Sequence, residues 1–275
     1  MNKKRQTVFI LCILIIAVGA GVSGYKWAMH LRNAGQMEAL QMTAHAQSTA
    51  LESTAAGSTA ADSSQSAVAG ASRSNVIPVN FDKLQASNPD IFAWLQIPDT
   101  DMDYPVAQHP TDDTYYLNHG SDGIYSEYGC PYIERADSKS LTQFNTVIYG
   151  HNMNDGSMFG VLHKYEDADF LKNHREITVY TPQHIFTYTV FAAVMYSDRH
   201  IPYYYDDTVE ADRAAFLKSL KTDTVKARSQ VLDDITVTSK DHILTLSTCD
   251  RKLRSNRYLV VSVLTQLDGQ AVGEQ

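Results

Sequence analysis

The sequence predicts a mostly β domain with helical additions, built as a mostly antiparallel barrel or sandwich. Beyond Pro98, short runs rich in β-branched and aromatic residues are separated by turn residues, which is typical of strands. Strand and helix patterns do not alternate along the chain, so a parallel sheet is not indicated. The expected strands are MDYPVA, CPYIE, NTVIYGH, EITVYT, IFTYTVFAAVMY, HILTLSTC and RYLVVSVLTQL.

The helical additions lie before the first strand and between two later strands. In FDKLQASNPDIFAWLQI, apolar residues recur at helical spacing. We expect Asn88 and Pro89 to begin a second short helix there, because proline is well accepted in a first turn. From about Thr208 to Ser229, the chain contains the amphipathic segment VEADRAAFLKSLK, which predicts a helix with one buried face.

Residues 1–27 are expected to form a cytoplasmic basic tip followed by a transmembrane signal-anchor. Lys3, Lys4 and Arg5 precede an uncharged stretch over residues 7–25. As a helix, this stretch would span roughly 28 Å, close to a bilayer core of about 30 Å. Because positive charges stay in the cytoplasm, the expected localisation is the cell membrane, single-pass, with the remaining chain extracellular. A cleaved signal peptide is the alternative, since small residues near the end of the stretch suit a signal peptidase.

The rest of the chain divides into a spacer and a folded domain. Residues 28–75 are rich in Ala, Ser, Thr, Gln and Gly and have almost no large apolar residue after Met42, so they cannot bury a core. We expect a low-complexity extracellular spacer, whose first part, to about residue 50, can continue as a helix. Residues 76–275 are expected to form the catalytic domain.

Composition argues against several classes of function. The formal net charge is −8 at pH 7 and no long basic run follows residue 5, which disfavours a nucleic-acid partner. The three cysteines, Cys12, Cys130 and Cys249, include no CxxC pair and are too few for a disulfide framework. The ten histidines show no HExxH or similar spacing, so neither a metal site nor a cofactor is expected.

Three residues are candidates for catalysis. Cys249 follows the strand HILTLST and precedes the basic loop DRKLRSNR, whose arginines would lower the pKa of a thiol; the alternative is a half-buried structural cysteine. His151 follows NTVIY and enters a turn-rich stretch, where it could be the base partner of a cysteine or a surface residue without a role. Arg257 begins RYLVVSVL and could stabilise an oxyanion if this strand lies beside the one that ends at Cys249; otherwise it is a solvated charge.

These segments resemble a known family. TLSTC, followed by Arg257 and the strand RYLVV, looks like the sortase signature TLxTC…R, and IYGHNM upstream of SMFGVLHKY resembles the sortase histidine segment. NPDIFAWLQIPDTDMDYPV, YYLNHG and the helical insertion after IPYYYDD are similar to class B sortases in particular. The resemblance covers about residues 78–267, in order and without large gaps. One departure is the basic loop after Cys249, where many relatives carry acidic or aromatic residues; another is Cys130, where relatives often have Ser.

The resemblance implies a fold and a reaction. The fold is an eight-stranded sortase β-barrel with two N-terminal helices and a helix before the seventh strand. The reaction is that of a thiol protease-like transpeptidase of Gram-positive cell surfaces: Cys249 attacks the Thr carbonyl of a C-terminal sorting signal and forms a thioacyl-enzyme. His151 then protonates the leaving amine and deprotonates the incoming one, and Arg257 supports the substrate and the oxyanion. Arg251 or Arg254 could compete for that last role; we favour Arg257 because it directly precedes the apolar alternation.

The resemblance also implies contacts and partners. Leu117 and Ser247 fall where class B enzymes bind the sorting signal, although they could equally be a core residue and a strand hydroxyl. The partners would be surface proteins with an NPxTx-like signal and an amine acceptor from the cell-wall cross-bridge precursor. A pilin-polymerising enzyme with a Lys acceptor, a surface cysteine protease acting mainly by hydrolysis, and a non-enzymatic binding barrel are the alternatives. A regulatory disulfide between Cys130 and Cys249 is a minor alternative for the thiols.

Overall fold

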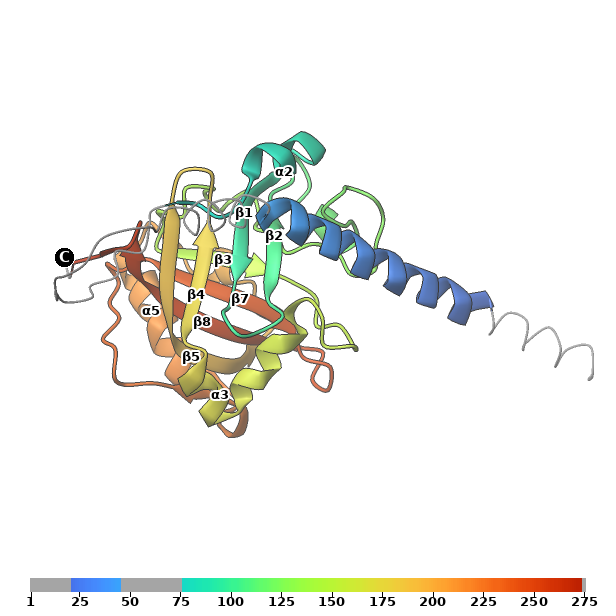
Figure 1. Ribbon diagram of the computed structural model, residues 1–275. Helices are drawn as coiled ribbons and strands as arrows, with labels where there is room; N and C mark the ends of the chain where they lie inside the picture. Colours follow the sequence, from blue (N-terminus) through green and yellow to red (C-terminus); the bar gives the residue numbers. More distant parts are fainter. Residues whose placement is uncertain (1–20, 46–75, 274–275) are drawn as a thin grey trace, which may run out of the picture. The chain divides into compact units, whose positions relative to one another are not determined.

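The computed structural model describes residues 21–45 and 76–273. By its internal contacts the chain divides into two units, Met1–Leu40 and Gln41–Gln275. Residues 21–45 form one α-helix, drawn in blue in Figure 1. The part of the expected spacer over residues 28–45 is therefore helical, as its helix-forming composition suggested.

The expected membrane-spanning helix is not supported, and the single-pass localisation based on it is corrected accordingly. Within residues 21–45 and 76–273, no helix combines the length and the apolar character needed to cross a bilayer. The reason lies in the sequence of the first helix, where Lys26, Arg32 and Glu38 interrupt the apolar residues. Residues 7–20, on which most of the expected span falls, lie outside the described residues.

The segment expected to contain two short helices forms one helix and one strand. Helix α2 (Phe81–Ser87) begins at Asn80, whose side chain accepts a hydrogen bond from the Lys83 amide, and ends at Asn88. The chain then enters β1 (Ile91–Gln96) instead of a second helix. The prediction of a helix here is wrong because Ile91–Leu95 is buried throughout, between β2 (Asp103–Ala107) and β4 (Glu176–Tyr180). A continuous apolar run of this length suits a strand that is covered on both faces.

The core is a nine-stranded sheet whose main path runs β2-β1-β4-β5-β8-β7-β3, with two short strands, β6 and β9, at β5 and β8. It departs from the expected eight-stranded barrel, and one pair, β3 with β7, is parallel within the mostly antiparallel sheet. The other ladders are antiparallel. The remaining strands are β3 (Asn145–Tyr149), β5 (Ile185–Ser197), β6 (Gln230–Val231), β7 (Ile243–Cys249), β8 (Asn256–Leu267) and β9 (Gln270–Ala271).

The segment CPYIE, expected to be a strand, connects the two edges of the sheet at one residue. Tyr132 forms isolated bridges to Ala107 at the end of β2 and to Tyr149 at the end of β3. The amides and carbonyls of Tyr132 and Tyr149 exchange two hydrogen bonds of 3.1 and 2.8 Å. Because β2 and β3 are the ends of the strand path, this contact brings the last residue of β3 close to the opposite edge of the sheet.

Helices cover the sheet and its ends (Figure 1). The predicted amphipathic segment contains α5 (Glu210–Thr222), which buries Phe216 and Leu220 against Val147 of β3, Ile243 of β7 and Leu259 of β8. The helix is held by burial of this apolar face. The shorter helices are η1 (Tyr115–Leu117), η2 (Phe159–Glu166), α3 (Ala168–Asn173), α4 (Ile201–Tyr204) and η3 (Lys226–Arg228).

Candidate functional site

Two neighbouring parallel strands bring His151 and Cys249 to the same edge of the sheet. The register of β3 and β7 pairs Tyr149 with Ser247. Beyond that pair, the Gly150 amide donates to the Ser247 carbonyl at 3.1 Å, and the Thr248 hydroxyl donates to the Gly150 carbonyl at 2.7 Å. Because the pairing continues to this point, the two strands end side by side, with His151 just after β3 and Cys249 as the last residue of β7.

A second pairing brings Arg257 to the same place. In the antiparallel ladder between β7 and β8, Cys249 lies directly opposite Arg257. The Arg257 Nη1 donates to the carbonyls of Arg254 at 3.4 Å and Asn256 at 3.2 Å. The guanidinium is therefore held near the Cys249 strand end by its own turn. Cys249 is exposed and free, which leaves its thiol open to a substrate.

These residues share one pocket of about 260 Å³. Every residue predicted to act in catalysis or substrate binding lines it: Leu117, His151, Ser247, Cys249 and Arg257. Apolar and aromatic side chains form much of the remaining wall, as is usual for ligand pockets. The pocket is also lined by Thr114, Tyr132, Glu134, Tyr149, Gly150, Ser197, Asp198, Arg199, His200, Ile201, Thr248 and Leu259.

The orientation of His151 is set by a main-chain contact of Leu117. The Nε2 atom of His151 lies 2.6 Å from the Leu117 carbonyl oxygen. A carbonyl only accepts, so Nε2 carries a proton and donates it, which leaves Nδ1 as the nitrogen that can exchange a proton. Leu117 therefore has a second role through its backbone, which sequence reasoning missed because a carbonyl contact leaves no signal in the side chain.

Gly150 allows the His151 segment to pack closely on η2. A Cβ atom on Gly150 would lie 2.6 Å from the ring of Phe159, a fully buried side chain at the start of η2. The Phe159 amide in turn donates to the His151 carbonyl at 2.9 Å. Only glycine permits this approach, so the position of His151 depends on the absence of a side chain before it.

The structure separates the three candidate arginines. Arg257 lines the pocket of Cys249, whereas Arg251 lines a neighbouring, larger pocket and donates from Nη2 to the Met153 carbonyl. Arg254 is exposed, and its described contact with Arg257 is through its backbone carbonyl. Strand register, rather than distance along the loop, thus distinguishes Arg257 from the others.

Cys130 is a buried thiol that does not line the Cys249 pocket. It is buried with Ala107, Tyr116 and Tyr132, and its Sγ lies 3.6 Å from the Pro105 carbonyl oxygen. Burial raises the pKa of the Cys130 thiol, which keeps it protonated. Cys130 and Cys249 are both free, so the disulfide considered between them is not formed.

Three residues that line the Cys249 pocket each have a polar atom without a hydrogen-bond partner among the described residues. The atoms are the Tyr149 hydroxyl, the Ser197 hydroxyl and Nδ1 of His200, and all are buried. The other ring nitrogen of His200 lies 2.8 Å from the Glu134 carboxylate. A buried polar group without a partner costs about 1–3 kcal/mol.

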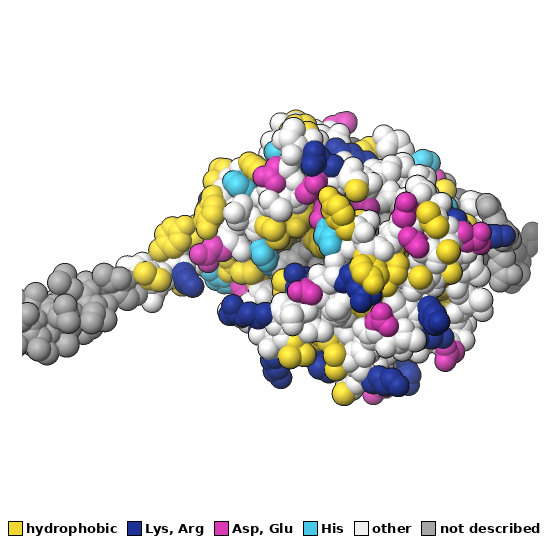
Figure 2. All heavy atoms as spheres, turned by 180° about the vertical axis from the view of Figure 1, so that it is seen from behind, with side chains coloured by type: hydrophobic (Ala, Val, Ile, Leu, Met, Phe, Trp, Pro, Cys, Tyr) yellow, Lys and Arg dark blue, Asp and Glu magenta, His cyan; other side chains and the backbone are white. Residues whose placement is uncertain are grey.

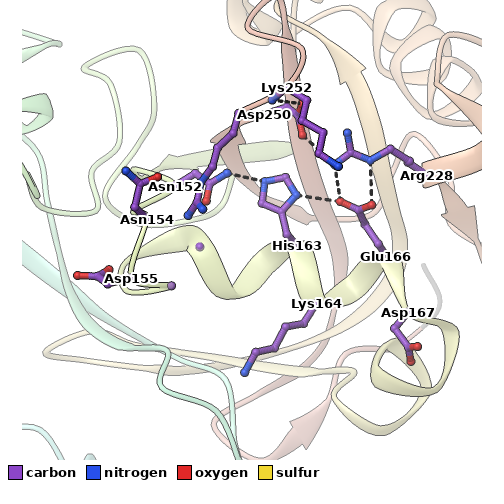
Figure 3. A pocket seen from close by; sticks show the side chains of 13 residues that line it. Asn152, Asn154, Asp155, His163, Lys164, Glu166, Asp167, Arg228, Asp250 and Lys252 are labelled. Atoms are coloured by element: carbon purple, nitrogen blue, oxygen red, sulfur yellow. Dashed lines mark hydrogen bonds and ion pairs between the residues drawn. The ribbon is translucent and has the colours of Figure 1, made fainter.

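A larger pocket, of about 770 Å³, is lined by Asn152 and by Asp250, the residue that follows Cys249 (Figure 3). Its wall contains a row of polar contacts that begins beside His151 and ends beside Cys249. Sequence reasoning missed these residues, because three of them lie on two short helices that are separated in the chain: His163 and Glu166 on η2, and Arg228 on η3. The row consists of Asn152, His163, Glu166, Arg228 and Asp250.

Two further features of the molecule are the charge of its surface and the placement of residues of metal-binding types. On the face shown in Figure 2, Lys and Arg side chains are mixed with Asp and Glu, and the face is hollowed between hydrophobic and His side chains. Such a mixed face does not provide the clustered positive charge that nucleic acids need. Within residues 21–45 and 76–273, no group of three or more His, Cys, Asp or Glu side chains is placed to hold a metal ion.

Several known proteins are similar to this chain in sequence. A family model described as the sortase domain matches residues 95–265. The chain is 36% identical over 167 residues to sortase B of Listeria monocytogenes, an alignment that covers 61% of this chain and 65% of that protein. It is 30% identical over 170 residues to sortase B of Staphylococcus aureus, covering 62% and 67%. The chain thus spans about two thirds of the length of these relatives.

Solved structures of class B sortases are also similar to this chain. The chain is similar to a Staphylococcus aureus sortase B–substrate complex, with a TM-score of 0.59 and 28% identity over 67% of this chain and 83% of that one. It is also similar to sortase B of B. anthracis in complex with AAEK1, with a TM-score of 0.58 and 31% identity over 67% and 83%. A Streptococcus pyogenes class B sortase involved in pilus biogenesis matches with a TM-score of 0.59 and 25% identity over 67% and 97%.

Proposed function

We propose that this chain, which belongs to the sortase family, is a class B sortase that acts as a cysteine transpeptidase on surface proteins. Members of the family are cysteine transpeptidases, so the proposal assigns the family's reaction to this chain. The observation that carries it is the convergence of Cys249, His151 and Arg257 on one pocket. We also propose that residues 76–275 form the catalytic domain.

In the proposed acylation step, the Cys249 thiolate attacks the carbonyl carbon of a Thr residue in a C-terminal sorting signal. The carbonyl electrons move to oxygen, and the Arg257 guanidinium stabilises the resulting oxyanion. When the intermediate collapses, the C–N bond breaks and the leaving amine takes a proton from His151. The product of this half-reaction is a thioester on Cys249 together with the released C-terminal peptide.

In the second half-reaction, an amine attacks the thioester carbon and loses its proton to His151. The C–S bond then breaks, which forms an amide and restores the thiolate and the imidazolium. The Leu117 carbonyl supports this role, because it occupies Nε2 and leaves Nδ1 for the proton transfers. The same His151 atom thus serves as acid in the first step and as base in the second.

The proposed substrate is a surface protein with an NPxTx-like sorting signal. Such a signal combines an Asn amide with peptide groups, and residues with hydrogen-bonding side chains, among them Thr114, Ser197 and Thr248, line the Cys249 pocket. Leu117 and Ser247 at the pocket wall are proposed as further contacts to the signal.

The proposed acceptor is the amine of the cell-wall cross-bridge precursor. A pilin Lys is the second candidate, because one structural relative is a Streptococcus pyogenes class B sortase involved in pilus biogenesis. Water would replace the amine in an enzyme that acts mainly as a protease. Transfer to an amine and hydrolysis by water give different products from the thioester, so product analysis separates them.

The test is to incubate the full chain with an NPxTx-type peptide, with and without a short glycine peptide or a Lys derivative as acceptor. We expect a ligated product that requires the amine and is absent with Cys249→Ala. Cleavage at one rate in both conditions, without ligated product, would contradict transpeptidation and leave hydrolysis as the activity. A comparison of the two amines distinguishes wall anchoring from pilin polymerisation.

A further inference from the structure

A row of polar side chains connects the residue after His151 with the residue after Cys249 (Figure 3). The Asn152 Nδ2 atom lies 2.8 Å from His163 Nε2, and His163 Nδ1 lies 3.0 Å from Glu166 Oε1. Arg228 donates to both Glu166 oxygens, from Nε at 2.8 Å and from Nη2 at 2.6 Å. The same Nη2 donates to Asp250 Oδ2 at 2.8 Å. We call these five residues the Asn152–Asp250 row.

The partners fix the direction of each hydrogen bond. Arg228 lowers the pKa of Glu166 through its hydrogen bonds, so Glu166 is a carboxylate and accepts from Nδ1–H of His163. In the neutral imidazole, Nε2 is then an acceptor and takes one N–H of the Asn152 amide at 2.8 Å. The same Nε2 lies 3.3 Å from the Cys249 carbonyl oxygen, so His163 also contacts the main chain of Cys249. Within the row, each of these donors therefore has an acceptor, and the Asn152 side chain is held in one orientation.

The second N–H of Asn152 is directed at the main-chain carbonyl of Cys249. The Asn152 Nδ2 atom also lies 2.9 Å from the carbonyl oxygen of Cys249. Because Asn152 directly follows His151, its amide connects the histidine segment with the main chain of Cys249. The ladder between β3 and β7 ends at Tyr149 and Ser247, so this hydrogen bond continues the link between the two segments beyond that ladder.

The far end of the row holds the chain on the other side of Cys249. Asp250 is buried, and its Oδ1 accepts from the amides of Lys252 at 2.9 Å and Leu253 at 2.6 Å. Burial raises the pKa of Asp250, but the hydrogen bonds from Arg228 and these amides outweigh it and lower the pKa. The main chain around Cys249 is therefore held at two points. The Cys249 carbonyl accepts a hydrogen bond from Asn152, and the next residue, Asp250, is held by hydrogen bonds from Arg228 and from two amides.

We propose that Asn152 is a positioning residue, anchored by His163, which holds the Cys249 main chain so that its thiol stays within reach of His151. The inference rests on the proposed function, in which Cys249 and His151 act together. Neither Asn152 nor His163 touches the reacting atoms in this assignment. Their effect is on geometry, and misplacement of a reacting group by about 1 Å can cost about 100-fold in rate.

The test compares variants that keep or lose the donor on Asn152. Asn152→Ala removes it, and Asn152→Asp replaces it with an oxygen of similar size that cannot donate to the Cys249 carbonyl. We expect both to lower kcat by about 10- to 100-fold, with little change in KM. Lys164→Ala, in the same pocket wall and outside the row, is the matched control and should keep wild-type kinetics.

His163 provides a rescue test. His163→Gln keeps an acceptor for Asn152 and a donor for Glu166, whereas His163→Leu keeps neither. We expect His163→Gln to retain most of kcat and His163→Leu to fall to the level of Asn152→Ala. Equal loss in both His163 variants would overturn the anchoring role, and unchanged kcat in Asn152→Ala would overturn the positioning role.

Alkylation of Cys249 makes the result independent of the peptide substrate. The rate of modification by iodoacetamide, followed at the Cys249 peptide by mass spectrometry from pH 5 to pH 10, reports the thiolate and its surroundings. We expect the midpoint of this profile to shift in Asn152→Ala and not in Lys164→Ala. An identical profile in Asn152→Ala would contradict the proposal. A wild-type chain that is alkylated normally but transfers no peptide would instead contradict the proposed function.

Discussion

Cys249 and Arg257 lie directly opposite each other across the ladder between β7 and β8. Their proximity is therefore set by main-chain register and not by the composition of the loop between them. This explains how a loop with further arginines can still place one of them in the pocket that Cys249 lines. Arg251 is engaged elsewhere, through the Met153 carbonyl.

Replacement of Arg257 should separate the arginines by function. We expect Arg257→Ala to lower kcat by about 100- to 1,000-fold, the usual cost of removing a donor to an oxyanion. Arg254→Ala is the matched control, because its contact with Arg257 is through a backbone carbonyl that the substitution keeps. Steady-state transfer of a sorting peptide measures both. A larger loss in Arg254→Ala than in Arg257→Ala would contradict the assignment.

The two described cysteines should differ sharply in reactivity. Cys249 is exposed, whereas burial raises the pKa of Cys130 and a neutral thiol is a poor nucleophile. We expect iodoacetamide at neutral pH to modify Cys249 in the folded chain while Cys130 reacts only after unfolding. Peptide mapping gives the site. Cys130→Ala should keep transpeptidase activity, and its inactivation would show that Cys130 takes part in the reaction.

Gly150→Ala should damage both stability and activity. The new Cβ would meet the Phe159 ring at 2.6 Å, so Phe159 or the His151 segment must move. Overpacking of this kind costs about 1–3 kcal/mol in the free energy of unfolding. Urea unfolding and peptide transfer measure the two effects. Gly35→Ala is the control, since nothing lies within 4 Å of a Cβ there and helices favour alanine. Equal stability of Gly150→Ala and wild type would refute the steric argument.

Asp137 should make the domain less stable at alkaline pH. Burial raises its pKa to about 8, helped by the charges of Asp207 and Glu134, while the Val147 amide and Gln143 act in the opposite direction. The folded-state pKa exceeds the ordinary value of 3.8, so the folded chain holds an extra proton between these values. Its stabilising contribution is complete below about pH 4 and is lost as the pH rises through about 8.

The corresponding measurement is urea unfolding of the wild type and Asp137→Asn at pH 5, 7 and 9. We expect the wild type to lose stability from pH 5 to pH 9 and the variant to lose less, because the amide does not titrate. Asp101→Asn, at an exposed position, controls for a general change in charge. The same pH slope in Asp137→Asn and wild type would show that this carboxyl does not cause the loss.

The strands near the site and the pairing of β7 with β8 could be predicted from local patterns, but the pairing of β3 with β7 could not. The alternation in HILTLSTC and RYLVVSVLTQL indicated β7 and β8, and the short loop between them indicated that Cys249 and Arg257 could meet. The parallel pairing of β3 with β7 joins segments far apart in the chain, and nothing local signals it. The position of His151 beside Cys249 depends on that pairing. At the sequence level it rested on the resemblance to sortases.

The errors have equally specific causes. Helical spacing in Ile91–Leu95 was misleading because a strand buried on both faces can match a helical pattern by chance. The Asn152–Asp250 row was missed because Arg228 belongs to η3, which reaches Asp250 only in the folded domain. The contact between His151 and Leu117 was missed because it uses a carbonyl, which every residue has.

The most direct test of the central claim is the intact mass of the chain after a brief reaction with an NPxTx-type peptide, quenched in acid. A thioacyl mechanism predicts an added mass equal to the peptide up to and including its Thr, located on Cys249, absent in Cys249→Ala and lost when an amine acceptor is added. Cleavage of the peptide without this adduct, or an adduct that persists in Cys249→Ala, would contradict the account.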